Sequence, residues 1–470
     1  MDERYDVCVI GAGTAGFAAA EAADADGLRV LLVSGPGALG GTCILRGCMP
    51  AKTLLSSTEA LGDVERVRGV GVNVAGAHVD VPAIIERKRE LVDYFTADRV
   101  ANLARFELVR GCARFVARDT IAVGEQRISA DRFIVATGSR VVPPAIPGLA
   151  EAGYLLSDDV LELIRIPPAV AVLGGGPVGC EFAQYFARLG ARVTLLQDAP
   201  QLLRNEDRDV ADAVAATLKA DGVDVICGAH IEHCVRAGEH TSVTYTAGAA
   251  SVTVRVGALL LASGRVPNVA GLELDAAAVL AGADRLAVDP YLRTTNPHVL
   301  AAGDVIGRRC LVHLAAYTGK LAVRNAFAER PQPADFDRFE MHAVYTQPQV
   351  AVAGLTESAC RVRGLNVRVK HHPFHEVGKA LVSNEAVGFV KMIADEGGRI
   401  VGVTVVGADA IDLIGEAVAL INFGATVGDV AAMPHLHPAL GEIFGRVAED
   451  LGATANVISR SALLSGKSAE

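Results

Sequence analysis

The sequence lacks tryptophan altogether, and aromatic residues of all kinds make up only 5% of its 470 residues. It also lacks a long hydrophobic run, because the apolar stretch near its start, residues 6–20, is interrupted by glycines and is too short to span a bilayer. Positive charge is not in excess either, since the formal net charge is −10. This balance argues against nucleic acid or an anionic membrane as the main partner.

What the sequence has instead is small and aliphatic. Hydrophobic residues make up 51% of the chain, and 49 of its residues are glycine. This Ala/Val/Gly-rich composition is typical of a soluble α/β protein and not of a disordered or fibrous one. A chain of 470 residues is too long for a single core, so we expect two to four domains.

Nine cysteines are present, and the acidic start, Met1-Asp2-Glu3-Arg4, does not resemble a signal peptide. We therefore expect a cytoplasmic protein, in which a reactive cysteine pair is more often catalytic than structural. Seven of the nine cysteines have no second cysteine at a spacing that would indicate a pair, and we predict that they are small buried thiols. They are Cys8, Cys112, Cys180, Cys227, Cys234, Cys310 and Cys360.

A glycine-rich motif appears twice in the same local setting. The apolar run Tyr5–Ile10 is followed by the motif at residues 11–16, an Ala-rich helix and a second strand at Arg29–Val33. Strand, glycine loop and helix in this order are typical of a dinucleotide-binding unit, with the helix N-terminus facing the pyrophosphate. The pattern returns at Ala169–Leu173 with residues 174–179, and Pro177 suits a first helical position. Two such units predict two dinucleotides.

The segment 40–52 carries the most distinctive chemistry. Cys43 and Cys48 are five positions apart. This spacing by itself is weak evidence for a redox pair, because two cysteines so spaced are usually unrelated buried thiols. In an ideal helix, positions five apart are separated by about 7.5 Å along the axis, whereas a disulfide needs Cα atoms within about 4.4–6.8 Å. A bond between them would therefore distort the turn, with Gly47 as the point of relief. A strained, accessible disulfide is easily reduced, as a redox cycle requires.

With its two glycine motifs, this segment resembles the redox-active segment of the FAD-dependent pyridine nucleotide–disulfide oxidoreductases, a family that includes dihydrolipoyl dehydrogenase, glutathione reductase and mercuric reductase. The resemblance covers nearly the whole chain. It implies an α/β fold with two Rossmann-like domains, for FAD and NAD(P), and a C-terminal α+β dimerisation domain. The implied boundaries are 1–150 (FAD, first part), 151–268 (NAD(P)), 269–338 (FAD, return segment) and 339–470 (dimerisation).

The resemblance also implies roles for single residues. Cys48 would face the flavin, Cys43 would attack the substrate as a thiolate, and Lys52 with Glu181 would form an ion pair beside the flavin's reactive nitrogen. Residues implied to bind FAD are Gly11, Gly13, Gly16, Ser34, Gly41, Thr42, Lys52, Ala113, Ala136, Thr137, Gly138, Asp304, Leu314 and Ala315. Residues implied to bind NAD(P)H are Gly174, Gly176, Pro177, Val178, Gly179, Gln197, Ile231 and Gly264. No metal site is predicted.

Near the C-terminus, His437 and Glu442 match the family's H-P-x-x-x-E element. A leaving thiolate needs a proton, which an imidazole oriented by a carboxylate can donate near neutral pH. His437 would be the donor and Glu442 the orienting group, while His435 is predicted to be a packing residue. The family places this histidine over the disulfide of the other subunit, so the resemblance implies a homodimer with shared active sites.

Two positions depart from the family. Where many members carry a glutamate for the adenosine ribose of FAD, this chain has Ser34, which loses a charge-assisted hydrogen bond. In the second unit the corresponding residue is Gln197, neither the acidic residue typical of NAD nor an arginine for a 2′-phosphate. Asp198 should repel that phosphate and Arg204 could reach it, so we expect a slight preference for NADH.

The function predicted is an NAD(P)H-linked disulfide oxidoreductase most like dihydrolipoyl dehydrogenase, acting on a small disulfide, a dithiol or a lipoyl protein. A mercuric reductase is the nearest alternative, although no cysteine follows Cys360, where members of that group carry a vicinal pair. A transhydrogenase without redox cysteines is disfavoured by Cys43 and Cys48. A redox-sensing flavoprotein with little turnover is the alternative from another class.

Overall fold

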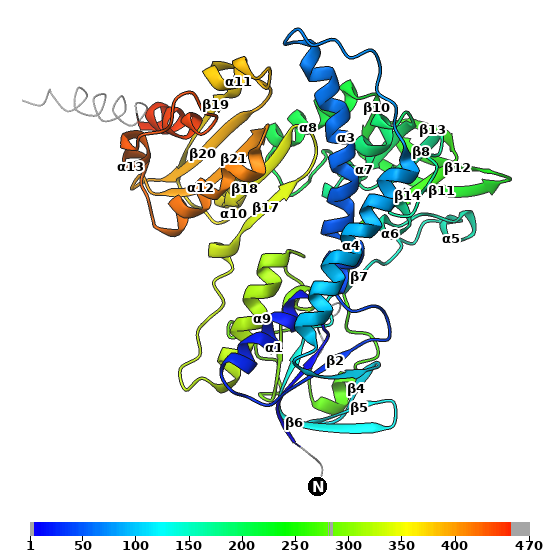
Figure 1. Ribbon diagram of the computed structural model, residues 1–470, viewed down its shortest axis with the longest axis vertical. Coiled ribbons are helices and arrows are strands. Elements are labelled where there is room, and N and C mark those ends of the chain that lie inside the picture. Colours follow the sequence, from blue (N-terminus) through cyan, green and yellow to red (C-terminus); the bar gives the residue numbers. More distant parts are fainter. Residues whose placement is uncertain (1–3, 281, 283–284, 453–470) are drawn as a thin grey trace, which may run out of the picture.

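The computed structural model describes residues 4–280, 282 and 285–452, so the predicted C-terminal domain is described as far as residue 452. Figure 1 shows three main sheets arranged around two long helices, α3 (Cys48–Arg68) and α4 (Val81–Leu103). The first sheet lies in the lower part of the view, the second at the upper right and the C-terminal sheet at the upper left. The predicted α/β class is confirmed.

The first sheet has seven strands in the order β3-β2-β1-β6-β5-β4, with β16 paired to β6. The bounds are β1 Tyr5–Ile10, β2 Val30–Ser34, β3 Glu107–Arg110, β4 Ala113–Ala117, β5 Thr120–Val123, β6 Gln126–Val135 and β16 Val299–Ala301. The central strands are parallel and apolar on both faces, as expected where helices cover a sheet. Because β16 follows the whole second unit in sequence, two distant chain segments build this sheet.

Helices α1 (Thr14–Ala25) and α9 (Val312–Phe327) pack against each other on the first sheet. Gly319 of α9 permits this contact, since a Cβ there would lie 2.2 Å from the carbonyl oxygen of Ala15. The short 3₁₀ turn η2 (Gly303–Ile306) leads from β16 toward α9 and carries Asp304. Further 3₁₀ turns are η1 Leu274–Ala277, η3 Asp337–Phe339 and η4 Phe374–Glu376.

The second main sheet is parallel, in the order β10-β9-β8-β14, and a three-stranded antiparallel sheet lies beside it. The bounds are β8 Ala169–Leu173, β9 Arg192–Gln197, β10 Val223–Cys227, β14 Ala258–Leu261, β11 Ala229–Ala237, β12 His240–Ala247 and β13 Ala250–Val256. The helices of this unit are α5 Leu149–Ala152, α6 Ser157–Val160, α7 Pro177–Arg188 and α8 Arg208–Ala220. Strands β7 (Ser139–Arg140) and β15 (Val266–Pro267) pair where the chain enters and leaves this unit.

The C-terminal sheet is antiparallel, in the order β17-β18-β21-β20-β19. The strands are β17 Met341–Val344, β18 Gln349–Gly354, β19 Val367–Pro373, β20 Phe389–Asp395 and β21 Ile400–Gly407. The helices are α10 Glu357–Val362, α11 Gly378–Val382, α12 Ala410–Asn422 and α13 Val427–Ala432, and residues 442–452 are also helical.

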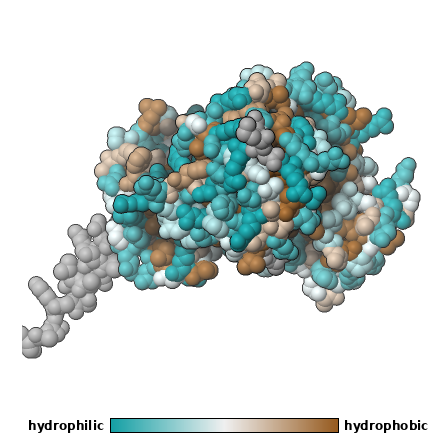
Figure 2. All heavy atoms as spheres, turned by 90° about the horizontal axis from the view of Figure 1, so that it is seen from below, coloured by the Kyte–Doolittle hydropathy of each residue, from teal (hydrophilic) through white to brown (hydrophobic). Residues whose placement is uncertain are grey.

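One apolar cluster joins the second sheet to the C-terminal sheet through α3. Leu54 of α3, Phe182 of α7 and Val350 of β18 belong to it, and all three are buried. The N-terminal end of α3, which carries Cys48, is thereby fixed between the units. Figure 2 shows a predominantly hydrophilic face with scattered hydrophobic residues. None of the described helices is both long enough and apolar enough to cross a membrane.

Candidate functional site

A single cavity of about 990 Å³ lies where the two glycine motifs meet the redox segment. Helix α1 begins after Gly13 and helix α7 after Gly176, and neither N-cap is satisfied by a side chain. Both helix starts line the cavity. Two uncapped N-termini therefore face one space, and free N–H groups together with the positive end of the helix dipole favour a phosphate there.

The two motifs are held by the same backbone contacts. Gly11 has a φ of +113°, and a Cβ on it would lie 2.3 Å from the carbonyl oxygen of Ala136. Gly174 has a φ of +111°, and a Cβ on it would lie 2.5 Å from the carbonyl oxygen of Ala262. Only glycine fits either position. The last glycines of the motifs, Gly16 and Gly179, would each place a Cβ less than 2 Å from the first glycine's carbonyl oxygen.

The cysteine pair lies at a break between two helices. Cys43 is in α2 (Gly41–Arg46) and Cys48 is the first residue of α3, with Gly47 between them. A Cβ on Gly47 would lie 2.8 Å from the carbonyl oxygen of Thr42, so the break requires glycine. Both cysteines are thiols in this structure, and both line the cavity. The interruption of the helix brings them close enough for a hydrogen bond between the two sulfur groups.

The two thiols are electrostatically different. The hydrogen bond from Cys43 lowers the pKa of Cys48 to about 7, against the opposing effect of burial and with help from the charge of Lys52. The same hydrogen bond, together with burial, raises the pKa of Cys43 well above its usual range. The reduced pair therefore holds a thiolate on Cys48 near neutral pH, with the proton on Cys43.

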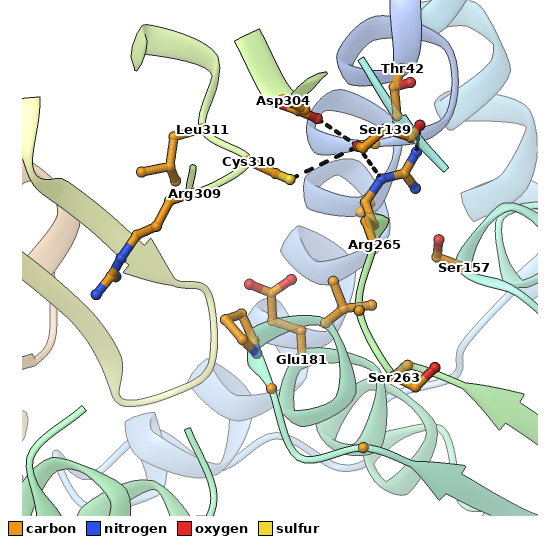
Figure 3. A pocket seen from close by; sticks show the side chains of 18 of the residues that line it. Thr42, Ser139, Ser157, Glu181, Ser263, Arg265, Asp304, Arg309, Cys310 and Leu311 are labelled. Carbon is orange, nitrogen blue, oxygen red and sulfur yellow. Dashed lines mark hydrogen bonds between the residues drawn. The ribbon is translucent and has the colours of Figure 1, made fainter. Parts of the chain in front are cut away.

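Lys52 and Glu181 form the ion pair expected from the sequence. Lys52 Nζ lies 2.7 Å from Glu181 Oε2, and it also lies 4.3 Å from the ring centroid of Tyr345. The second carboxylate oxygen accepts a hydrogen bond of 2.9 Å from the backbone N–H of Tyr345. Figure 3 shows the Glu181 carboxylate directed into the pocket. One charged pair is thus fixed at the cavity wall by helix α3, helix α7 and the loop that follows strand β17.

Asp304 is part of a polar chain on the opposite wall (Figure 3). Ser139 Oγ donates a hydrogen bond of 2.6 Å to Asp304 Oδ2, and Arg265 Nε donates one of 2.9 Å to Ser139 Oγ. Ser139 and Arg265 were not predicted as site residues. Each is next in sequence to a predicted site residue, Ser139 to Gly138 and Arg265 to Gly264. This adjacency is the sequence signal that could have identified the two residues.

The prediction that Cys310 is buried is wrong, because its thiol is exposed and lines the cavity 3.9 Å from Ser139 Oγ. Partial desolvation by the surrounding protein, and the nearby Asp304, raise the pKa of the Cys310 thiol to about 11. Cys112 is also exposed, and Cys227 is half-buried, whereas the other four are buried as expected: Cys8, Cys180, Cys234 and Cys360.

A second polar cluster at the cavity was not predicted either. His342 Nε2 lies 2.7 Å from Glu206 Oε1, and Arg309 Nη1 lies 2.9 Å from His342 Nδ1. The three residues come from the loop after β9, the segment before α9 and strand β17. Their spacing in sequence gave no sign that they meet.

The side chain of Gln197 is hydrogen-bonded to the second glycine motif. Its Oε1 accepts a hydrogen bond of 2.7 Å from the backbone N–H of Gly175. Gln197, Asp198 and Arg204 all line the cavity. This placement agrees with the sequence-based prediction that they lie near the nicotinamide nucleotide. Ser34 is buried at the end of β2 and is not a lining residue.

The structure brings most of the predicted site residues to this one cavity. Those that line it are Gly13, Thr42, Cys43, Cys48, Lys52, Ala136, Gly138, Gly174, Gly176, Pro177, Val178, Glu181, Gln197, Ile231, Gly264, Asp304 and Ala315. Those outside its lining are Gly11, Gly16, Ser34, Gly41, Ala113, Thr137, Gly179, Leu314, His437 and Glu442. Some of the residues outside the lining are glycines that allow a close approach of the backbone. At Gly41, for example, a Cβ would lie 2.7 Å from Gly13 Cα.

His437 lies on the surface, with 78% of its side chain exposed. Its Nδ1 is 2.8 Å from Glu442 Oε1, and the other carboxylate oxygen accepts a hydrogen bond of 3.0 Å from the N–H of Ala439. The bond to His437 lowers the pKa of Glu442. His435 instead pairs with Glu416 at 3.0 Å and is mostly buried, in keeping with a packing role. Within one chain, His437 does not line the cavity that holds the cysteines.

These features fit two dinucleotides. The cavity has two uncapped helix starts for two pyrophosphates, glycines where a Cβ would block close approach, and a carboxylate at Asp304 that can accept hydrogen bonds from hydroxyl groups. Among the described residues, no group of three or more His, Cys, Asp or Glu side chains could hold a metal ion.

Comparisons with known proteins agree with this geometry. The chain is 35% identical over 431 residues to a mercuric reductase of Bacillus cereus, covering 91% of this chain and 68% of that protein. It is 31% identical over 468 residues to a dihydrolipoyl dehydrogenase of Bacillus subtilis, covering 95% and 98%. Its fold matches the HOCl-induced flavoprotein disulfide reductase RclA of Escherichia coli in complex with Cu(II), with a TM-score of 0.84, 28% identity, and coverage of 95% and 99%.

The family described as pyridine nucleotide-disulphide oxidoreductase matches residues 5–319, and its dimerisation domain matches residues 341–448. The second match supports a homodimer. The two motif-bearing units, the thiol pair at the helix break and the C-terminal sheet all fall within these matched regions. The chain therefore belongs to the pyridine nucleotide–disulfide oxidoreductase family, whose members depend on FAD and use NAD(P)H.

Proposed function

We propose that the protein is an NAD(P)H-dependent disulfide oxidoreductase of the dihydrolipoyl dehydrogenase type, which interconverts a small disulfide or lipoyl group and its dithiol. The observation that carries this proposal is the Cys43–Cys48 pair, in which one hydrogen bond lowers the pKa of Cys48 to about 7 and raises that of Cys43. A thiol pair with one stabilised thiolate at a cavity wall is suited to exchange with a disulfide.

The reaction balances as one disulfide, one NAD(P)H and one proton giving two thiols and NAD(P)⁺. FAD, which would be held by the first glycine motif, Lys52 and Asp304, would supply the electron relay between the nicotinamide hydride and the Cys43–Cys48 disulfide. Cys43 then gives up its proton, attacks one sulfur of the substrate as a thiolate and forms a mixed disulfide, and the first sulfur to leave takes up that proton and departs as a thiol. Cys48 attacks Cys43 Sγ, releases the second thiol and restores the disulfide. Each leaving sulfur takes one proton.

The proposed proton donor is His437 of the partner subunit, oriented by its own Glu442. Support comes from the exposure of His437, its 2.8 Å contact with Glu442 and the matched dimerisation domain. In this proposal FAD occupies the domain of residues 1–150 and 269–338, the nicotinamide nucleotide occupies 151–268, and 339–470 form the dimer. NADH is the favoured nucleotide, because the charge of Asp198 opposes a 2′-phosphate.

A second candidate is reduction of a metal ion. It is favoured by the relatives named mercuric reductase and by the Cu(II) complex of the structural neighbour. An exposed thiolate on Cys48 is also a suitable ligand for a soft metal ion. Against it stands the absence of any cysteine after Cys360, where the second thiol pair of a mercuric reductase would be expected.

One set of assays separates these functions. The purified holoenzyme is supplied with NADH or NADPH and tested against lipoamide, glutathione disulfide, mercuric ion and Cu(II). We expect turnover with a disulfide, lost in Cys43→Ser, while reduction of an artificial acceptor that takes electrons directly from flavin persists. Turnover of metal ions alone would replace the proposal by the second candidate. Flavin reduction with no turnover of any of these acceptors would favour a redox sensor.

A further inference from the structure

Cys43 lies near a basic side chain, Arg99, that is outside the lining of the dinucleotide cavity. Helix α2, which carries Cys43, packs against α4, which carries Arg99. The guanidinium of Arg99 lies over the ring of Phe17, with Cζ 3.9 Å from its centroid. Arg99 does not line the cavity, although Cys43 does. Arg99 therefore lies outside the space that the two nucleotides would occupy.

Arg99 has no acceptor among the residues that the structure describes. Its Nη1 is buried without a hydrogen-bond partner, and no carboxylate in the described part of the chain lies within salt-bridge distance of the guanidinium. The nearest acidic groups are Glu21, which pairs with Arg105 at 3.3 Å, and the adjacent Asp98. Burial lowers the pKa of Arg99, so its charge is poorly solvated. A half-buried guanidinium without an acceptor is costly, and an anion would relieve that cost.

A second polar atom on the same helix face is also unsatisfied. Thr96 is three residues before Arg99, so the two side chains lie on neighbouring turns of one face of α4. The Thr96 hydroxyl is buried and has no hydrogen-bond partner in the described part of the chain. The charge of Arg99 also acts on Cys43, because it opposes the rise in the pKa of that thiol.

We infer that Arg99 makes the α4 side of Cys43 a site for an acceptor that carries a negatively charged group, such as a carboxylate, a short distance from its disulfide. The inference rests on the proposed disulfide exchange at Cys43 and adds the class of substrate. The guanidinium binds the anionic group, and the sulfur atoms come to lie against Cys43. Arg99 is then a specificity residue that contacts the substrate but takes no part in electron transfer.

The test uses three linear disulfides that differ chiefly in charge: dithiodipropionate (negative), bis(2-hydroxyethyl) disulfide (neutral) and cystamine (positive). The holoenzyme is compared with Arg99→Gln, Arg99→Lys and Arg105→Gln at low and high salt. Arg105 is the matched control, because it is a half-exposed arginine near the same helix that already pairs with Glu21. Turnover of an artificial acceptor reports whether flavin and nucleotide sites are intact in each variant.

Wild type should prefer the negative disulfide in kcat/KM over the neutral one by roughly tenfold, the worth of one partly exposed charge-assisted hydrogen bond. The preference should shrink at high salt. Arg99→Gln should abolish it with artificial-acceptor turnover unchanged, Arg99→Lys should retain part of it, and Arg105→Gln should retain all of it.

Equal kcat/KM for the three disulfides in wild type, or an unchanged preference in Arg99→Gln, overturns the inference while leaving the disulfide reductase intact. Weaker dimers of Arg99→Gln with no change in preference would also overturn it, since Arg99 would then pair with the partner subunit. If none of the disulfides is turned over while NADH still reduces the flavin, the proposed function fails, and the inference with it.

Discussion

Gln197 Oε1 accepts a hydrogen bond of 2.7 Å from the backbone N–H of Gly175. Since an N–H group can only donate, this contact fixes the orientation of the amide, and Nε2 is left as a donor at the cavity wall. A donor suits a ribose hydroxyl oxygen and a phosphate oxygen alike. A glutamate at this position would offer an acceptor to the hydroxyl and would repel the phosphate.

Gln197→Glu is therefore expected to raise the ratio of kcat/KM for NADH to that for NADPH by roughly tenfold or more. In wild type the ratio should favour NADH by less than roughly 200-fold, because no residue discriminates strongly. Initial rates with both nucleotides and one artificial acceptor give the ratio directly. Asp198→Asn, which removes the neighbouring charge, should move it the other way. A ratio that Gln197→Glu leaves unchanged would contradict this account.

The two thiols should be separable by spectroscopy. Because Cys48 carries the thiolate, partial reduction of the yellow holoenzyme should give a long-wavelength thiolate-to-flavin band. Cys43→Ser should keep this band and lose disulfide turnover, whereas Cys48→Ser should lose both. A band that persists in Cys48→Ser would reverse the assignment of the two cysteines.

The same band should titrate with pH. The pKa of Cys48 is about 7, so the thiolate, and the band with it, should grow as pH rises through that value and fade below it. Lys52 lowers this pKa through its charge, so Lys52→Met should move the midpoint of the titration upward. A spectroscopic pH titration of the two proteins measures the shift. An unchanged or lowered midpoint would count against the part assigned to Lys52.

Mixed dimers test whether the disulfide site is shared between subunits. General acid catalysis is typically worth about 10²–10⁴-fold, so His437→Ala should lower disulfide turnover by that order and spare artificial-acceptor turnover. Glu442→Gln should cost less. A heterodimer of Cys43→Ser and His437→Ala chains has both lesions in one site and none in the other. It should recover about half of wild-type activity, and no recovery in a verified heterodimer would place the site within one chain.

A buried ion network between the second unit and the C-terminal sheet should dominate the response of stability to mutation. Lys391 is 0% exposed, and its Nζ lies 2.7 Å from Asp207 and 2.9 Å from Asp209. Burial opposes ionisation of both carboxylates. Hydrogen bonds from Lys391, with others from Ser358 and His371, outweigh that effect and lower both pKa values.

Lys391→Met leaves these carboxylates without their cation and should lower the free energy of unfolding by about 3–5 kcal/mol. Because both folded-state pKa values are depressed, the network stabilises the fold above the unfolded pKa of about 4 and loses its effect as pH falls below it. Denaturant unfolding across that pH range measures both effects. Arg361→Gln, at an exposed pair with Glu357 on α10, is the matched control and should change little. Equal losses in the two variants would refute the assignment.

Local features were predictable from the sequence, and distant contacts were not. The strands before the two glycine motifs were predicted with their bounds, Tyr5–Ile10 and Ala169–Leu173, because apolar runs and glycine loops are local signals. The helix that carries Lys52 begins at Cys48 itself, directly after Gly47. The thiol pair, the Lys52–Glu181 pair and Asp304 were found by resemblance of motifs.

What the sequence could not show depends on which segments meet in space. The exposure of Cys310 follows from its place at the cavity, and its neighbours in sequence say nothing about that. The hydrogen bond of Gln197 to Gly175 required the side-chain orientation. Asp207 precedes α8, but its carboxylate accepts hydrogen bonds of 2.9 Å from the N–H groups of Glu357 and Ser358 at the start of α10. No local pattern marks such a contact.

The pairing of β16 with β6 has a consequence for the order of folding. Strand β16 and helix α9 complete the first sheet, and they are synthesised only after the whole second unit has left the ribosome. The second sheet is contiguous in sequence and has all its strands by Leu261. It can therefore form while the first sheet still lacks a strand, the Asp304 turn and the helix that packs on α1. We therefore expect nascent chains to complete the second unit first and the first sheet last.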